Sequence, residues 1–166
     1  MDIPPQNTSL VVMGVAGCGK SSLGNLCAES LDMPLLEGDD FHSESNVAKM
    51  RSGIALSDDD RAVWLNTLAE QLQAHPQGVV LTCSALKGRD RARWASGVPA
   101  ARSGSSDTTP AHLFPVSLVA SQFAALEDPC DEPGVLRLDA TQPLNDLGLA
   151  VVDWVRPAPL PVILEK

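Results

Sequence analysis

The sequence predicts an α/β fold, in which a parallel sheet is covered by helices on both faces. Three apolar runs typical of buried strands lie at residues 10–15, 78–83 and 135–138. Amphipathic helical patterns follow them or lie between them, at residues 20–32, 57–74 and 144–155. Strands that alternate with helices in this way usually pair in parallel, because each helix crosses the sheet before the next strand begins.

The shorter elements fit the same pattern. A second strand is expected at residues 33–37, and it ends in an acidic run at 37–40. A helix is expected from about Ser43 to Ser52, since Gly53 follows it. Ser57, followed by three aspartates, is typical of a capped helix start, where the helix dipole favours negative charge. Helical spacing in residues 57–74 predicts a buried face made of Trp64, Leu65, Leu68 and Leu72.

Length and composition predict one domain at residues 9–156, with tails at 1–8 and 157–166. No apolar run approaches the length needed to cross a membrane. The net charge of −9 argues against a nucleic-acid or anionic-membrane partner, because both would be repelled. The cysteines lack paired metal spacing, which favours a reduced, cytoplasmic protein; they are Cys18, Cys27, Cys83 and Cys130.

The most specific motif is G-x-x-x-x-G-K-S at residues 14–21. Its glycines allow the backbone to curl around phosphate, and the helix starting near Lys20 directs its positive dipole end there. Lys20 is expected to reach the β- and γ-phosphates of a nucleotide, and Ser21 to ligate Mg²⁺. The alternative is a glycine-rich turn that binds nothing; the flanking strand and helix patterns count against it. The residues expected to bind the nucleotide are Gly14, Val15, Ala16, Gly17, Cys18, Gly19, Lys20, Ser21 and Ser22.

Polar residues also follow two other predicted strands, and ligands of parallel α/β sheets collect at the carboxyl ends of strands. The second strand is followed by residues 37–42 (Glu-Gly-Asp-Asp-Phe-His), and the third by residues 84–87 (Ser-Ala-Leu-Lys). A carboxylate near the γ-phosphate can accept a proton from an attacking hydroxyl or help to hold Mg²⁺, and a lysine can bind an anionic acceptor. Asp39 and Asp40 could instead simply cap a helix.

Taken together, these motifs resemble a known family. The matching segments are residues 14–21, 37–42, 46, 49–50, 58–61, 64–65, 83–87, 112–115, 117–118, 121–123, 126–127, 139 and 142–144. They are similar to bacterial gluconokinase, a small P-loop kinase that phosphorylates D-gluconate at its 6-hydroxyl with ATP. The resemblance covers about residues 9–155. It implies the P-loop kinase fold, ATP and Mg²⁺ as cofactors, and gluconate as a small-molecule substrate.

The resemblance also implies roles for individual residues. Lys20 and Asp39 would be catalytic, with Asp39 accepting the proton of the gluconate hydroxyl. Ser21 and Glu37 would serve the metal. The contacts to the sugar acid would be His42, Arg61 and Lys87. Arg61 could instead form a surface ion pair. Asn46 and Lys49 could also contact the substrate, but both could simply be exposed helix residues. Trp64 is assigned to the core.

The chain departs from the family through an apparent internal deletion between about residues 99 and 102. The missing strand would lie between the phosphate-loop strand and the last strand, in the family order 2-3-1-4-5. We therefore expect four strands instead of five, in the order 2-3-1-5. A partner chain could also cover the gap, so a homodimer is left open. The lid, expected at about 102–116, would keep Arg102 as its one basic residue.

The leading hypothesis is ATP-dependent phosphorylation of D-gluconate to 6-phospho-D-gluconate, impaired by the deletion. One alternative is a nucleotide-binding relative of gluconokinase with weakened catalysis. Another is a small-molecule kinase with a different acceptor, such as shikimate or a nucleoside monophosphate. The motifs at 38–42 and 84–87 speak against a different acceptor.

Overall fold

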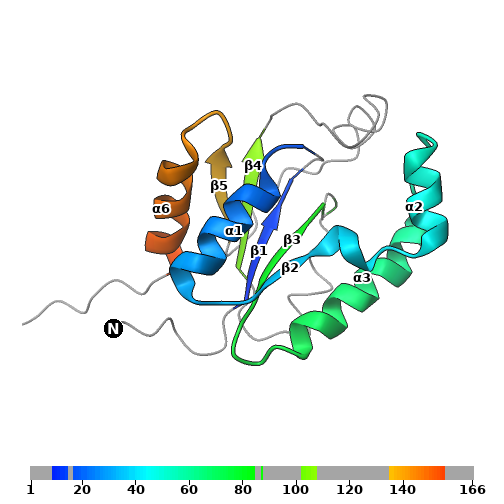
Figure 1. The fold of residues 1–166 in the computed structure, drawn as a ribbon, viewed down its shortest axis with the longest axis horizontal. Coiled ribbons are helices and arrows are strands. Elements are labelled where there is room, and N and C mark those ends of the chain that lie inside the picture. The colour runs from blue at the N-terminus through cyan, green and yellow to red at the C-terminus, as the bar shows by residue number, and fades with distance from the viewer. Residues whose placement is uncertain (1–8, 15–16, 85–86, 88–101, 108–134, 156–166) are drawn as a thin grey trace, which may run out of the picture.

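A five-stranded parallel sheet forms the centre of the molecule (Figure 1). The computed structural model describes residues 9–14, 17–84, 87, 102–107 and 135–155. The strands are β1 (Leu10–Met13), β2 (Leu35–Glu37), β3 (Val80–Cys83), β4 (Arg102–Asp107) and β5 (Val135–Asp139). They lie in the order β2-β3-β1-β4-β5, and every neighbouring pair is parallel. All carboxyl ends therefore meet at one edge of the sheet.

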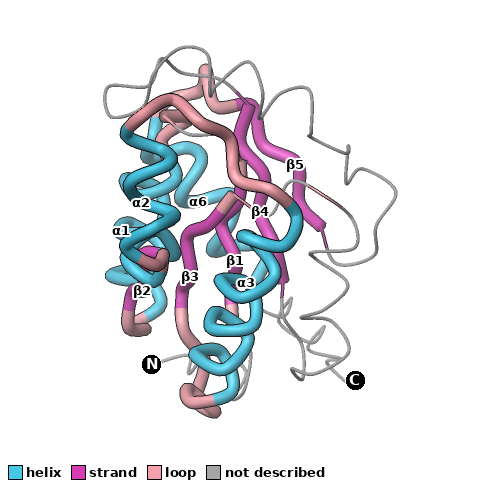
Figure 2. The backbone as a smooth tube through the Cα atoms, turned by 90° about the vertical axis from the view of Figure 1, so that its right-hand side faces the viewer, coloured by secondary structure: helices cyan, strands magenta, loops and turns pink. Residues whose placement is uncertain are grey.

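Helices cover both faces of this sheet, as the sequence predicts. They are α1 (Lys20–Leu31), α2 (Glu44–Arg51), α3 (Asp58–Gln73) and α6 (Leu144–Val155), with a 3-10 helix η1 (Gly38–Phe41) after β2. Figures 1 and 2 show α1 and α6 on one face and α3 on the other. In the described part of the chain, no helix is long and apolar enough to span a membrane.

Strand β1 separates two hydrophobic cores, because its side chains alternate between the two faces. Leu10 and Val12 pack with residues of α1 and α6. Val11 and Met13 pack with the buried face of α3, where Trp64 is 2% exposed. The core position predicted for Trp64 is thus confirmed. The predicted cap of α3 is confirmed too, since Ser57 and Asp60 form a reciprocal capping box.

The prediction of four strands in the order 2-3-1-5 is wrong, because β4 lies between β1 and β5. Leu10 pairs with Arg102 on one side of β4, and Gly104 pairs with Leu136 on the other. The segment reads Arg-Ser-Gly-Ser-Ser-Asp, so it has no apolar residue from which a strand could be predicted. Backbone hydrogen bonds to two neighbouring strands hold such a segment regardless of its side-chain types.

The expected lid segment at 102–116 needs a related correction. Arg102 is the first residue of β4 and lies in register with Leu10, the first residue of β1. The phosphate loop follows Met13, at the other end of β1. The backbone of Arg102 therefore lies at the opposite edge of the sheet from the loop, where a lid residue cannot be. The rest of the lid, the 112–127 motif and both predicted tails lie outside the described residues.

Helix α1 packs closely on the sheet at Gly24. A Cβ atom added there would lie 2.5 Å from Cγ2 of Thr82 and 3.2 Å from Cδ1 of Leu35. Thr82 belongs to β3 and Leu35 to β2. The absence of a side chain at Gly24 thus sets how near α1 can approach these two strands.

We predict that Gly24→Ala lowers the free energy of unfolding by about 1–3 kcal/mol, the usual cost of overpacking a core. The loss should occur although alanine favours a helix by about 1 kcal/mol over glycine. The reason is that Thr82 is buried and β-branched, so its methyl group cannot turn away from the new Cβ. Urea unfolding of both proteins measures the difference.

Gly148→Ala in α6 is the matched control. Its Cβ would meet Cδ2 of Leu26 at 2.4 Å, which is the end of a flexible, partly exposed side chain. Leu26 can change rotamer, so this variant should be close to neutral. Equal destabilisation by the two substitutions would contradict the explanation given for Gly24.

Candidate functional site

The phosphate loop joins β1 to α1 at the carboxyl edge of the sheet. Gly14, Gly17 and Gly19 have φ values of 152°, 77° and 90°, which other residues rarely adopt. Nothing lies within 4 Å of a Cβ built on Gly19, so backbone conformation rather than crowding requires glycine there. Helix α1 begins at Lys20 without a side-chain cap. Its first N–H groups, together with the helix dipole, therefore suit an anion.

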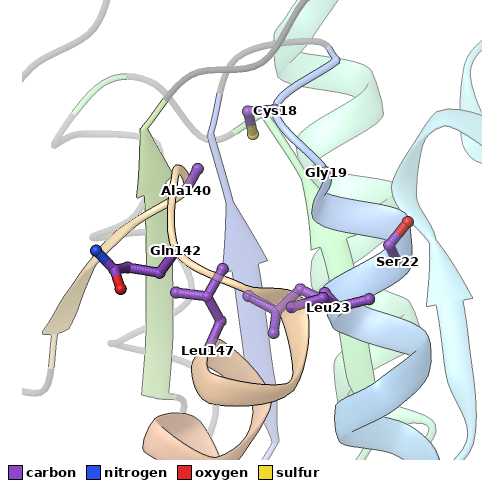
Figure 3. A pocket seen from close by; sticks show the side chains of 8 residues that line it. Cys18, Gly19, Ser22, Leu23, Ala140, Gln142 and Leu147 are labelled. Carbon is purple, nitrogen blue, oxygen red and sulfur yellow. The ribbon is translucent and has the colours of Figure 1, made fainter.

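A hollow of about 220 Å³ lies beside this loop, between the start of α1 and the turn before α6 (Figure 3). Ser22 and Gln142 give it polar groups, and leucines give it an apolar wall. Its lining residues are Cys18, Gly19, Ser22, Leu23, Ala140, Gln142, Leu144 and Leu147. A group attached to phosphates held by the loop would reach this hollow.

At the end of β2, Glu37 accepts hydrogen bonds from two hydroxyl groups. The Ser21 hydroxyl, at the start of α1, donates a hydrogen bond to Oε2 of Glu37 at 3.0 Å. The Thr82 hydroxyl donates to the same oxygen atom, and Thr82 is the register partner of Glu37 across β2 and β3. Sequence reasoning missed Thr82, because a single threonine inside a buried strand gives no functional signal.

The Ser21 and Glu37 oxygens suit Mg²⁺, which prefers oxygen ligands. The structure places these two candidate metal residues in direct contact. Among the described residues, no group of three or more His, Cys, Asp or Glu side chains could hold a metal ion. Mg²⁺ in kinase sites needs no such group, since it uses one or two protein ligands together with phosphates and water.

Helix η1 carries Asp39 beyond the end of β2, and His42 follows this helix as its C-cap. The Asp39 side chain is 54% exposed, and its Oδ1 lies 3.8 Å from Nε2 of His42. The His42 side chain is only 3% exposed and stacks on Trp64, with ring centroids 4.3 Å apart. The Trp64 indole also donates a hydrogen bond to the Gly38 carbonyl at 2.8 Å. Trp64 thus fixes both η1 and the His42 ring against α3.

The environment of His42 favours its neutral form. Burial lowers the pKa of His42 from its ordinary value of 6.5; Asp39 opposes this effect and Arg61 adds to it. With Nε2 facing the Asp39 carboxylate, the favourable tautomer carries its proton on Nε2, which makes Nδ1 an acceptor. Within the described residues, Nδ1 is buried and has no hydrogen-bond partner.

Two cations lie near the carboxyl end of β3. The Arg61 guanidinium donates to the Ser84 carbonyl at 2.9 Å and lies 5.6 Å from the Trp64 ring centroid. Lys87 donates to Oδ1 of Asp58 at 2.8 Å, near the start of α3. Arg61 is therefore held against Ser84 and Trp64, and Lys87 forms an ion pair with Asp58.

A second hollow, of about 410 Å³, is bordered by η1, α2 and α3. Its lining residues are Phe41, His42, Ser43, Ser45, Asn46, Asp59, Asp60, Val63, Trp64 and Thr67. Asn46 donates to the Asp60 carbonyl at 3.1 Å, and Lys49 contacts both Asp60 carboxylate oxygens at 2.8 Å. The Lys49 hydrogen bonds lower the pKa of Asp60 to about 2, with Ser57 contributing. Asn46 and Lys49 therefore attach α2 to α3.

The structure places most of the candidate residues along one edge of the sheet. They follow β1, β2 or β3 or lie at the start of a helix there, and they are Lys20, Ser21, Glu37, Asp39, His42, Arg61 and Lys87. Arg102 is not brought to this edge. Val15 and Ala16 lie outside the described residues.

No family model matches the chain. Curated relatives do match it. The chain is 34% identical to a probable gluconokinase of Rattus norvegicus, over 89% of this chain and 97% of the relative. It is 36% identical to the thermosensitive gluconokinase of Escherichia coli K12, over 79% of this chain and 78% of the relative. It is 39% identical to the gluconokinase of Gluconobacter oxydans, over 78% of this chain and 80% of the relative.

Solved structures agree with these relatives. A gluconokinase from Sinorhizobium meliloti superposes with a TM-score of 0.84 at 34% identity, covering 93% of both chains. An APS kinase from Mycobacterium tuberculosis has a TM-score of 0.65 at 20% identity, over 92% of this chain and 99% of that one. A shikimate kinase from Aquifex aeolicus has a TM-score of 0.61 at 13% identity, covering 89% of this chain and 95% of that one. At such low identity the last two show the fold alone, and they confirm the predicted P-loop kinase fold.

The rat relative matches along nearly its whole length. The Sinorhizobium gluconokinase matches the fold over almost all of this chain. A phosphate loop, paired Ser21 and Glu37, and Asp39 occupy one edge of the sheet. On these grounds the chain belongs to the gluconokinase family.

Proposed function

We propose that this protein transfers the γ-phosphoryl group of ATP to the 6-hydroxyl of D-gluconate, giving 6-phospho-D-gluconate and ADP. One observation carries the proposal. The phosphate loop, the Ser21–Glu37 pair and the Asp39 carboxylate lie along one edge of the sheet, in a member of the gluconokinase family. Phosphoryl transfer needs these parts side by side, because its catalysis is mainly positioning and charge stabilisation.

The nucleotide would bind on the α1 side of this edge. The loop N–H groups and Lys20 would hold the phosphates, and the 220 Å³ hollow would take the nucleoside. Ser21 and Glu37 would hold Mg²⁺, since they offer adjoining oxygen atoms. When bound, Mg²⁺ supplies charge neutralisation to the β- and γ-phosphate oxygens.

The acceptor would bind on the α3 side. Asp39 is exposed enough to meet a substrate hydroxyl, and its carboxylate would take the proton as oxygen bonds to phosphorus. Arg61 and Lys87 would attract the gluconate carboxylate, because a chain with a net charge of −9 needs local cations for an anionic substrate. The His42 side chain is only 3% exposed, so it would serve the acceptor mainly through Asp39, whose carboxylate faces its Nε2.

The observed sheet weakens one alternative, and the comparisons weaken the other. A nucleotide-binding relative with impaired catalysis depends on the loss of a central strand, and β4 occupies that place. A different acceptor, such as shikimate, finds support only in a fold-level likeness at 13% identity.

Location and assembly remain predictions. The described cysteines Cys18, Cys27 and Cys83 are buried and form no disulfide bond, which supports a reduced, cytoplasmic setting. The net charge supports a small-molecule substrate rather than nucleic acid. A homodimer is left open.

We predict that the purified protein releases ADP from ATP only when gluconate is added, with 6-phosphogluconate identified by mass spectrometry. Lys20→Ala should lower kcat by roughly two orders of magnitude or more, because one preorganised contact to the transferred charge is worth about 3 kcal/mol. Circular dichroism should show an intact fold. Full activity in a folded Lys20→Ala protein would exclude Lys20 from catalysis and point to a contaminating kinase.

Asp39→Asn should lower kcat by about 10²–10⁴-fold, the usual contribution of a general base. The affinity for ATP should change little, since Asp39 faces the acceptor side. Asp40→Asn is the control, because this neighbouring carboxylate is exposed on the same short helix and should leave kcat largely unchanged. An equal loss of ATP affinity in Asp39→Asn would assign Asp39 to the nucleotide or metal instead.

His42 should make the fold sensitive to acid. Burial lowers its pKa in the folded state below 6.5, so the unfolded chain binds a proton first as the pH falls. The stability that neutral His42 contributes is therefore complete above its unfolded pKa and is lost as the pH falls through the folded pKa. His42→Phe keeps a ring beside Trp64 but cannot titrate.

In urea unfolding, His42→Phe should lose less stability than the wild type as the pH falls from about 7.5 to about 5.5, the range around the histidine pKa. Identical pH profiles of His42→Phe and the wild type would show that His42 is not buried in its neutral form.

A further inference from the structure

Thr82 is a buried polar residue that none of the roles above uses. It is 2% exposed in a strand whose other residues are apolar, namely Val80, Leu81 and Cys83. Valine has almost the same shape as threonine and would fill this place equally well. A buried hydroxyl group also carries a desolvation cost unless it is hydrogen-bonded. The hydroxyl of Thr82 therefore calls for an explanation other than packing.

Both branches of the Thr82 side chain are engaged. Its Oγ1 donates to Oε2 of Glu37. Its Cγ2 methyl group lies against α1, 2.5 Å from where Gly24 would carry a Cβ. One branch thus holds the carboxylate at the end of β2, while the other fixes how α1 lies on β3.

Ser21 completes this arrangement from the other side. It precedes Gly24 by three residues, so the two lie on the same face of α1. Its hydroxyl donates to the same Oε2 atom that Thr82 contacts. The two donors come from α1 and β3 and fix the carboxylate between them, while the lone pairs of Ser21 Oγ stay available to a cation.

We propose that Thr82 is a positioning residue for the Mg²⁺ site. Its hydroxyl holds the Glu37 carboxylate in the orientation in which Glu37 accepts the hydrogen bond from Ser21. In this orientation Ser21 and Glu37 together bind the cation. Groups that orient metal ligands in this way commonly change metal affinity 10–100-fold when they are removed. The inference rests on the proposed function only because it takes Mg²⁺ and a nucleotide as the ligands.

The test compares variants that differ by the hydroxyl group alone. Thr82→Val keeps the shape and removes the hydroxyl. Thr82→Ser and Thr82→Ala form a second pair that lacks the methyl group in both members, which keeps the comparison valid if the valine variant folds poorly. Calorimetric titration with ADP, without Mg²⁺ and at increasing Mg²⁺ concentrations, separates metal binding from nucleotide binding without any turnover.

Thr82→Val should raise the Mg²⁺ concentration needed for half-maximal strengthening of ADP binding by at least about 10-fold. ADP affinity without Mg²⁺ should be unchanged, and the Tm should shift by no more than about 4 °C. Thr82→Ser should keep the wild-type Mg²⁺ dependence, whereas Thr82→Ala should match Thr82→Val. Equal Mg²⁺ dependence in the serine and alanine variants overturns the proposal. A valine variant whose ADP binding is weakened as much without Mg²⁺ as with Mg²⁺ also overturns it.

The outcome is independent of gluconate turnover. A wild type that binds ADP more tightly with Mg²⁺ but does not phosphorylate gluconate overturns the proposed function, and the variants then still decide the role of Thr82. An active wild type whose Thr82→Val variant keeps the same Mg²⁺ dependence overturns the role of Thr82 alone.

Discussion

The close packing of α1 on strands β2 and β3 is the constraint on which the proposed nucleotide side of the site depends. Gly24 has no side chain, so the Thr82 methyl group can lie against the helix. One turn earlier on the same helix face, Ser21 then lies within hydrogen-bonding distance of Glu37. The phosphate loop ends where α1 begins, so its anchoring also depends on the position of this helix. A helix displaced from β3 would separate the Ser21 hydroxyl from the carboxylate.

Trp64 organises the proposed acceptor side, on the opposite face of the sheet. Its indole nitrogen holds the Gly38 carbonyl, its ring stacks on His42, and the Arg61 guanidinium lies over it. Because Trp64 is itself part of the α3 core, these three groups are positioned by the same packing that stabilises the fold. The groups proposed to bind the nucleotide and those proposed to bind the acceptor thus belong to different faces of the sheet and meet at its carboxyl edge.

Strand β4 shows why hydrophobic patterns predict too few strands for this sheet. Its six residues are polar or glycine, yet it pairs with β1 on one side and β5 on the other. Hydrophobic patterns detect strands that bury apolar side chains, whereas this strand is held between its neighbours by backbone pairing. With β4 in place, β1 has a neighbour on each side, and the main reason to expect weakened catalysis disappears.

The sequence by itself determined the features that are encoded locally. The glycines of the phosphate loop, the Ser57 cap and the apolar period of α6 act within a few residues, so the order of residues along the chain is enough to recognise them. Tertiary structure alone decided which distant residues meet. Thr82 reaches Glu37 only through the β2–β3 register, and His42 meets Trp64 only because η1 packs on α3. Neither partner is specified by its neighbours along the chain, because such contacts depend on how separate elements pack together.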